Sequence, residues 1–276
     1  MTKTLYISDL DGTLLNSSSR VSPETAKLIS GLGKRGAMIT VATARTAATA
    51  DPLLKDCDIR IPAVVTTGAA LWDFDRRRYI DPVFIDGEEY RRIIALFRSE
   101  GYMSFVYELQ PDGMMRVFHT PQLNAAEQLF YEQRKDLHLK HFQLNGVPAD
   151  ADRVMLIFGT GPRQMIERIA ARLREDCDCS VSCYPDIFNP EVALIELFAP
   201  GVNKAAAIRR LAAQTGADRV VVFGDNLNDL PMMREADLSV AVANALPEVR
   251  AEAKLVIGGN DDNAVARFIE YDFEKA

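Results

Sequence analysis

Residues 5–15 read LYISDLDGTLL, and this stretch decides how the rest of the chain is interpreted. A short apolar run with strand propensity leads into two acids, Asp9 and Asp11, which are followed by Gly12 and Thr13. An Asp-Gly pair between apolar runs is also a strong hairpin signal, so a simple turn is the alternative interpretation. A turn needs only one acid, whereas two carboxylates about 4 Å apart repel each other by roughly 4 kcal/mol in a partly screened site. The pair therefore favours a position where a cation binds.

The composition is that of a globular protein large enough for two domains. The chain has 276 residues, of which 48% are hydrophobic and 26% are charged. The net charge of −7 and the lack of a long basic run argue against a nucleic-acid partner. No apolar stretch has the character of a signal peptide or a membrane span, so we expect a cytoplasmic protein with no membrane partner. We also expect a monomer or a weak homo-oligomer.

Two patterns that often mark binding sites have a structural interpretation here. Residues 177–183 contain a C-x-C-x3-C pattern without the paired spacing of a zinc site, so we expect all four cysteines to be reduced and structural. Residues 31–36 read GLGKRG, a formal match to the dinucleotide loop G-x-G-x-x-G. That loop must follow a strand and open a helix, whereas here a predicted helix precedes it and a strand follows. These glycines therefore predict a helix end and a turn.

The order of the predicted elements indicates an α/β core that is divided in the sequence. Strands over residues 5–8, 37–42 and 62–66 alternate with helices, the pattern of a parallel sheet that is covered on both faces. In the middle of the chain, pairs of strands between helices are typical of a separate α+β module. We therefore expect a doubly wound, mostly parallel core formed by residues 1–82 and 190–276, with an inserted cap domain at residues 83–189.

Polar residues follow the predicted core strands at their carboxyl ends, where ligands bind in open α/β sheets. Thr43 follows the second strand, and its hydroxyl can donate a hydrogen bond to a bound anion, although a threonine at a strand end is common without any function. Lys204 starts a helix, where a cation opposes the local dipole and indicates a nearby anion; a surface lysine is the alternative. Residues 224–229 read GDNLND, and two acids and two amides exceed what a helix cap requires. Their oxygens are ligands that Mg²⁺ prefers.

Together these segments resemble the four signature motifs of the haloacid dehalogenase-like phosphatases. Residues 9–13 are similar to the family's DxDGT, residues 43–45 to TGR, residues 202–204 to the third motif and residues 224–229 to GDxxND. The long insert resembles the large cap of the Cof-type sugar-phosphate phosphatase branch. The resemblance implies that Asp9 attacks phosphorus. It also implies that Asp11 is a general acid/base that lends its backbone carbonyl to Mg²⁺.

The same resemblance assigns expected roles to the other motif residues. It implies that Asp225 is a direct metal ligand and that Asp229 acts through water or orients its neighbours. The substrate-binding residues implied in this way are Gly12, Thr43, Ala44, Arg45, Lys204 and Asn228, and the metal-binding residues are Asp9, Asp11, Asp225 and Asp229. Two departures from the branch are that Ala44 stands where Gly is usual and Thr67 where Asn is usual.

We therefore predict a Mg²⁺-dependent phosphatase that hydrolyses small phosphate monoesters, either sugar phosphates or a phosphorylated cofactor, through an aspartyl-phosphate intermediate. Two alternatives stay open. One is a phosphomutase or phosphotransferase that uses the same nucleophile, and the other is a catalytically silent binding protein. All matched residues lie outside the insert, so we expect the cap to set specificity without supplying the chemistry. Residues 184–189 are the predicted contact with the leaving group.

Overall fold

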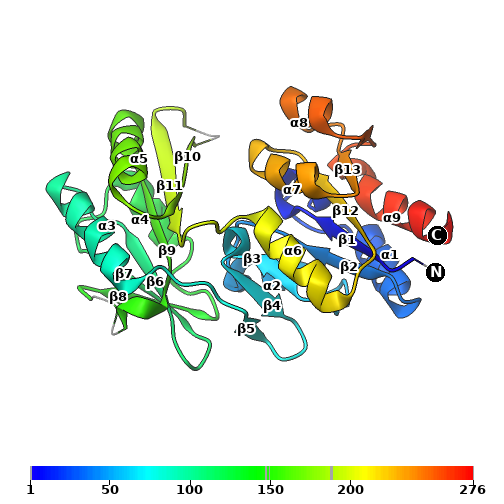
Figure 1. Ribbon diagram of the computed structural model, residues 1–276, viewed down its shortest axis with the longest axis horizontal. Helices are drawn as coiled ribbons and strands as arrows, with labels where there is room; N and C mark the ends of the chain where they lie inside the picture. The colour runs from blue at the N-terminus through cyan, green and yellow to red at the C-terminus, as the bar shows by residue number, and fades with distance from the viewer. Residues whose placement is uncertain (1, 147, 149, 187–188, 276) are drawn as a thin grey trace. The chain divides into compact units, whose positions relative to one another are not determined.

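The computed structural model describes residues 2–146, 148, 150–186 and 189–275, and the chain divides into two units. The first unit comprises residues 1–81 and 203–276, and the second comprises residues 82–202. Figure 1 labels the helices and strands of both units. Each unit has its own sheet and its own hydrophobic core.

The first unit is built on a five-stranded sheet in which every pair of neighbouring strands is parallel. Its central strands are buried on both faces because helices cover the sheet on both sides. The strand order is β14-β13-β12-β1-β2. Their bounds are β1 (Thr4–Ser8), β2 (Met38–Val41), β12 (Arg219–Gly224), β13 (Leu238–Ala241) and β14 (Leu255–Val256).

Helices of the first unit pack in pairs on the sheet. On one face lie α1 (Pro23–Lys34) and α9 (Ala264–Lys275), and on the other lie α6 (Lys204–Thr215) and α7 (Leu230–Glu235), as Figure 1 shows. The shorter α8 (Pro247–Glu252) follows β13. Ser22 caps α1 by accepting a hydrogen bond from the backbone N–H of Thr25 at 3.0 Å. The glycine run 31–36 ends this helix, and Gly36 has a φ of 98°, so it forms no dinucleotide loop.

A second, small sheet extends the first unit beyond β2. The predicted third strand, β3 (Ala63–Val65), is joined to the parallel sheet by the isolated bridge between Ala42 and Val64. It pairs instead with β4 (Ala70–Asp73), which pairs with β5 (Arg78–Ile80), both in antiparallel fashion. Neither β4 nor β5 was predicted from the sequence. This hairpin packs on α2 (Ala47–Leu54), where the Tyr79 hydroxyl accepts a hydrogen bond from the N–H of Ala47 at 3.1 Å.

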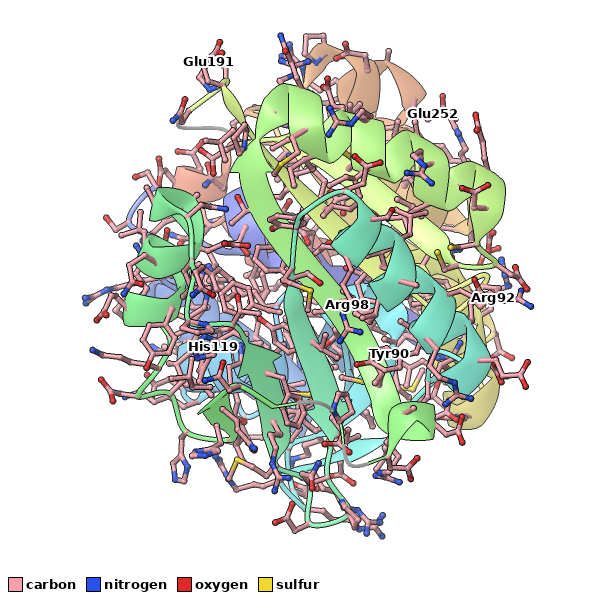
Figure 2. All side chains as sticks on the ribbon, turned by 90° about the vertical axis from the view of Figure 1, so that its left-hand side faces the viewer. Tyr90, Arg92, Arg98, His119, Glu191 and Glu252 are labelled. Atoms are coloured by element: carbon pink, nitrogen blue, oxygen red, sulfur yellow. The ribbon has the colours of Figure 1, made fainter. Side chains whose placement is uncertain are left out.

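The second unit has a six-stranded mixed sheet with the order β10-β11-β9-β6-β7-β8. Two long helices, α3 (Gly87–Ser99) and α5 (Arg163–Asp176), cover one face and bury apolar side chains such as Ile93 and Ile169 against it. Figure 2 looks onto these helices, with Tyr90 and Arg98 of α3 labelled. The short α4 (Ala125–Glu132) packs on β9. The strands are β6 (Phe105–Leu109), β7 (Met115–His119), β8 (Lys140–Leu144), β9 (Val154–Pro162), β10 (Ser180–Pro185) and β11 (Val192–Phe198).

These two units confirm the predicted fold class, a parallel α/β core with an inserted α+β domain. One boundary has to be corrected. The return to the core was expected at residue 190, but the second unit continues to Val202. The reason is that β11, expected to be a core strand, forms antiparallel pairs with β9 and β10 in the second sheet. Its apolar sequence suits either sheet, so local sequence could not decide between them.

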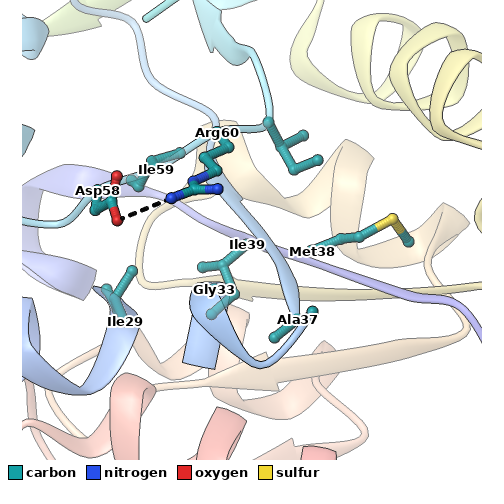
Figure 3. Close-up of a pocket in the computed structure, with 10 residues that line it drawn as sticks. Ile29, Gly33, Ala37, Met38, Ile39, Asp58, Ile59 and Arg60 are labelled. Atoms are coloured by element: carbon teal, nitrogen blue, oxygen red, sulfur yellow. Dashed lines mark hydrogen bonds and ion pairs between the residues drawn. The ribbon is translucent and has the colours of Figure 1, made fainter. Parts of the chain in front are cut away.

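Three further observations concern parts of the molecule outside the predicted site. No helix among the described residues is long and apolar enough to cross a membrane. A cavity of about 200 Å³ lies beside α1 and β2 (Figure 3), with mostly aliphatic walls and an exposed ion pair of 3.5 Å between Asp58 and Arg60. It contains none of the predicted site residues. The four cysteines are free thiols, as expected.

Candidate active site

The carboxyl ends of β1 and β12 bring two of the predicted acids together. Asp9 directly follows β1, and its backbone N–H donates to the carbonyl of Phe223, near the end of β12, at 2.9 Å. Asp225 follows the last residue of β12. Because these two strands are neighbours in a parallel sheet, residues far apart in the sequence emerge side by side at one edge.

Lys204 is the centre of the charged cluster. It is the first residue of α6, and only 1% of its surface is exposed. Its Nζ donates to Oδ1 of Asp9 at 2.5 Å and to Oδ1 of Asp229 at 2.7 Å. Asn203 places the lysine by capping α6, since its side chain accepts from the N–H of Ala206 at 2.8 Å. Lys204 was predicted to bind the substrate, and its bridge between two acids was not foreseen.

Asp229 is completely buried, and both of its oxygens are bound. While Oδ1 accepts from Lys204, Oδ2 accepts from the backbone N–H groups of Asp225 at 3.0 Å and Asn226 at 3.1 Å. Gly224 makes this possible, because a Cβ at that position would lie 2.7 Å from the Cβ of Asp229. Asp229 therefore shapes the loop after β12 and orients Lys204.

Asp225 lies against the loop that carries the first motif. Its Oδ1 accepts a hydrogen bond from the Thr13 hydroxyl at 2.9 Å. Gly12, with a φ of 78°, is required here, since a Cβ would lie 2.4 Å from Oδ2 of Asp225. The Gly12 carbonyl accepts from Nδ2 of Asn244 at 2.7 Å. The glycine of the DxDGT-like stretch thus permits close packing against the acid.

Asp11 is not part of the buried cluster, and its carboxylate pairs with Arg45. The contact is bidentate, with Nε of Arg45 2.7 Å from Oδ2 and Nη2 2.6 Å from Oδ1. About half of the Asp11 side chain is exposed. The hydrogen bonds to Asp11 make the largest contribution to the pKa of Arg45, and they raise it. Burial lowers this pKa, and the Coulombic attraction of Asp11 and Asp9 raises it, so that the net shift is upward.

The other predicted substrate-binding residues occupy three different environments. Thr43 is buried, and its hydroxyl oxygen accepts from the backbone N–H of Arg45 at 3.1 Å. Ala44 beside it is half-buried. Asn228 is exposed at the end of the loop after β12, and its side chain makes no hydrogen bond with the described residues. The structure thus joins Thr43 and Arg45 to each other and Arg45 to Asp11, while the side chain of Asn228 is exposed.

Burial dominates the electrostatics of the acids. It is the largest cause that raises the pKa of Asp225 to about 6, with a further upward contribution from Asp229. The pKa of Asp9 is also raised, first by burial and then by the neighbouring carboxylates of Asp229 and Asp225, while Lys204 opposes the rise. The attraction of Asp229 and Asp9 raises the pKa of Lys204 despite its burial, so the lysine is charged.

The charge balance of the cluster fits a divalent cation. Asp9, Asp225 and Asp229 each place a carboxylate oxygen so that all three lie within 4.8 Å of one another, and Lys204 contacts two of them, Asp9 and Asp229. A bound cation favours the ionised form of nearby carboxyls, and with all three acids ionised the acids and Lys204 together carry a charge of −2. An all-oxygen donor set is what Mg²⁺ binds. Asp11 was predicted to offer the metal its backbone carbonyl, and its carboxylate pairs with Arg45 instead of joining this group.

Two residues of the site were missed in the sequence. Thr13 belongs to the first motif but received no role, although its hydroxyl holds Asp225. Asn244, which holds the loop at Gly12, follows the carboxyl end of β13. The rule that located the other candidates, a polar side chain just after a core strand, would also have found Asn244. In the second unit, part of the predicted loop at residues 184–189 lies outside the described residues, namely positions 187 and 188.

Comparison with known proteins defines the class of this protein. Residues 6–269 match the haloacid dehalogenase-like hydrolases, and the chain belongs to this family. It is similar to an HMP-PP phosphatase of Serratia proteamaculans (strain 568), with 24% identity over 277 residues that cover 95% of this chain and 93% of the relative. It is also similar to a pyridoxal phosphate phosphatase of Escherichia coli (strain K12), with 25% identity over 282 residues and 98% of each chain covered.

Solved structures of haloacid dehalogenase-like hydrolases have a similar fold. A haloacid dehalogenase-like hydrolase from Bacteroides thetaiotaomicron superposes with a TM-score of 0.77 at 19% identity, covering 99% of this chain and 100% of that chain. The family expected from the four motifs is therefore confirmed. The expected enzyme class, a phosphatase, is the class of the Serratia and Escherichia relatives, which match over nearly their full length.

Proposed function

We propose that this protein is a Mg²⁺-dependent phosphatase that hydrolyses small phosphate monoesters through an aspartyl-phosphate on Asp9. The observation that carries the proposal is the buried arrangement of Asp9, Lys204 and Asp229, with Asp225 beside them. A nucleophilic acid next to fixed positive charge is what phosphoryl transfer needs from a protein.

In the first step, a carboxylate oxygen of Asp9 attacks phosphorus, and the bond to the alcohol oxygen breaks. Oδ1 of Asp9 is bound to Lys204, so Oδ2 is the oxygen available for attack. Asp11 delivers a proton to the departing alcohol oxygen. For this step Asp11 must carry the proton and leave its pair with Arg45, whose guanidinium then becomes available to a phosphoryl oxygen.

In the second step, water attacks the phosphorus of the aspartyl-phosphate and gives its proton to Asp11. Inorganic phosphate leaves, and the Asp9 carboxylate is restored. The carboxylate form of Asp11 that accepts this proton is the form that pairs with Arg45. Thr43 and Lys204 lie at the carboxyl end of β2 and the start of α6, where their donors can hold phosphoryl oxygens.

Asp9, Asp225 and Asp229 are the residues that would hold Mg²⁺, with Asp229 already committed to Lys204 and two backbone N–H groups. When bound, Mg²⁺ neutralises charge on the phosphoryl oxygens. Asp225 has one oxygen held by Thr13, which keeps the carboxylate turned toward the cluster.

We expect Asp225→Asn to remove the response to Mg²⁺ while stabilising the metal-free protein. Burial disfavours the charged form of Asp225, whose pKa is raised to about 6, so folding is penalised wherever this acid is ionised. The gain in thermal stability should therefore be full above about pH 6, shrink as the pH falls, and vanish below about pH 3, where Asp is protonated in both states. Melting curves with EDTA and with Mg²⁺ measure both effects.

Asp75→Asn is the matched control, because Asp75 is an exposed acid of the β4–β5 turn. It should change neither the Mg²⁺ response nor its pH dependence. An unchanged Mg²⁺-induced shift in Asp225→Asn would mean that the metal binds elsewhere.

A panel of phosphate esters with Mg²⁺ tests the proposed function. The relatives act on HMP-PP and pyridoxal phosphate according to their names, so the panel should contain phosphorylated cofactors as well as sugar phosphates and nucleotides. We expect release of inorganic phosphate from at least one sugar or cofactor phosphate. Transfer of the phosphate to a second position of the substrate would instead reveal a mutase, and inactivity on the whole panel would favour a binding protein.

A further inference from the structure

The turn after β3 has an uncommon backbone conformation. Thr66, Thr67 and Gly68 have successive φ angles of 52°, 57° and 101°. β-branched residues rarely adopt a positive φ, because their Cβ substituents crowd the neighbouring backbone. Among the non-glycine residues with positive φ in the described parts of the chain, these two threonines are the β-branched ones. The surroundings must therefore hold the turn in this conformation.

Buried hydroxyls add to the cost of this turn. The Oγ1 atoms of Thr66 and Thr67, and that of the adjacent Thr46, are buried and have no hydrogen-bond partner among the described residues. A buried polar group without a partner destabilises the folded state. Strain and unpaired polar groups of this kind persist where a local geometry is needed for function.

On one side, the turn is bonded to the segment that carries Thr43 and Arg45. The N–H of Thr66 donates to the Arg45 carbonyl at 2.8 Å, and the N–H of Thr67 donates to the Thr43 carbonyl at 3.0 Å. These two bonds fix the backbone from which the Thr43 hydroxyl and the Arg45 guanidinium project.

On its other side, the turn packs against the start of α6. A Cβ added to Gly68 would lie 2.4 Å from the carbonyl oxygen of Asn203, so the two backbones are in direct contact. The Gly68 carbonyl also accepts from Nη2 of Arg210 at 3.2 Å. Asn203 immediately precedes Lys204, whose Nζ contacts Asp9 and Asp229.

We propose that the turn Thr66–Gly68 is a rigid spacer that sets the distance between the Thr43–Arg45 segment and Lys204, with Gly68 as its key positioning residue. The inference rests on the proposed function, because it concerns the groups that would hold the phosphoryl oxygens. A Cβ added at Gly68 would displace the first turn of α6, and Lys204 would move away from Asp9 and Asp229. Errors of about 1 Å in such positions reduce turnover by roughly 100-fold.

Gly68→Ala tests the spacer, and Gly36→Ala is its matched control. Gly36 has nearly the same φ, 98° against 101°, but an added Cβ there meets nothing within 4 Å. Both variants place an alanine at a similar positive φ, so both should melt at a lower temperature. Only Gly68→Ala should lose kcat, by about 100-fold, at a temperature where both variants are folded. Equal kcat values for the two variants would overturn the proposal.

Hydrogen exchange separates a failure of the spacer from a failure of the proposed function. The N–H of Ala206 donates to the Asn203 side chain at 2.8 Å, and the N–H of Ala207 donates to the Asn203 carbonyl at 3.3 Å. These amides should exchange faster in Gly68→Ala than in Gly36→Ala, whether or not any ester is hydrolysed. Unchanged exchange at α6 would overturn the spacer even if the enzyme is a phosphatase.

Two further variants, Arg210→Met and Thr67→Asn, and the control Asp81→Asn keep the proposal open to test if Gly68→Ala does not fold. Arg210→Met removes the donor to the Gly68 carbonyl and should lower kcat several-fold, whereas Asp81→Asn, which alters the other partner of Arg210, should not. Thr67→Asn should raise the melting temperature and keep activity within about twofold, because Asn accepts a positive φ more readily. Equal activity of Arg210→Met and Asp81→Asn would contradict the spacer. Loss of activity in Thr67→Asn would instead assign the hydroxyl to the substrate and overturn it.

Discussion

Asp9→Asn is expected to reduce the release of phosphate by several orders of magnitude while leaving the fold intact. The amide cannot replace the carboxylate that attacks phosphorus, and loss of a nucleophile has effects of this size. The fold should tolerate the change because Lys204 retains its ion pair of 2.7 Å with Asp229. The buried charge that is removed is itself disfavoured by burial, which raises the pKa of Asp9. Steady-state assays with the best ester of the panel measure the loss.

The control for this variant is a check that it still folds. Circular dichroism and the melting temperature in EDTA measure this. A folded, inactive protein supports the nucleophile. Activity within about tenfold of the wild type would exclude Asp9 from this role, since a residue that only binds substrate causes losses of that smaller size. Trapping of the aspartyl-phosphate in the wild type, and its loss in Asp9→Asn, would connect the kinetic effect to the intermediate.

The sequence predicted which residues lie together better than it predicted which side chains they contact. Asp9, Lys204, Asp225 and Asp229 lie together because each follows a core strand or starts a core helix, and parallel topology brings such positions to one edge. The partner of each side chain depends on distances between elements, which sequence spacing does not contain. For this reason, the bridge of Lys204 between two acids and the pair of Asp11 with Arg45 could not be predicted from sequence spacing.

The fold shows the same division between local and long-range information. Long amphipathic helices such as α3 and α5, and buried strands such as β1, were predictable from periodicity and apolar composition. Strand β8 reads KHFQL and β10 reads SVSCYP, and neither has the composition of a buried strand. Both are edge strands whose pairing depends on neighbours that are distant in the sequence.

Lys204→Met is expected to have the largest effect on stability. The substitution keeps the length of the side chain but leaves Asp9 and Asp229, both less than 10% exposed, without their common cation. Removing one partner of a buried ion pair costs about 3–5 kcal/mol, because the remaining charge is buried without compensation. Denaturant unfolding in EDTA at pH 7 measures the loss. Lys27→Met, at an exposed position of α1, should change the free energy of unfolding by less than about 0.5 kcal/mol.

The acids left by Lys204→Met can relieve their repulsion by taking up a proton. The destabilisation should therefore shrink as the pH falls toward 5, since a protonated carboxyl no longer repels its neighbour. For the same reason, Lys204→Met should cost less when it is made in the Asp9→Asn protein, where one of the two facing charges is already gone. The difference between the two costs is the coupling energy between Lys204 and Asp9. Equal costs in both backgrounds would show that the contact of 2.5 Å between Lys204 and Asp9 contributes nothing to stability. The stabilising contact of Lys204 would then be the one with Asp229 alone.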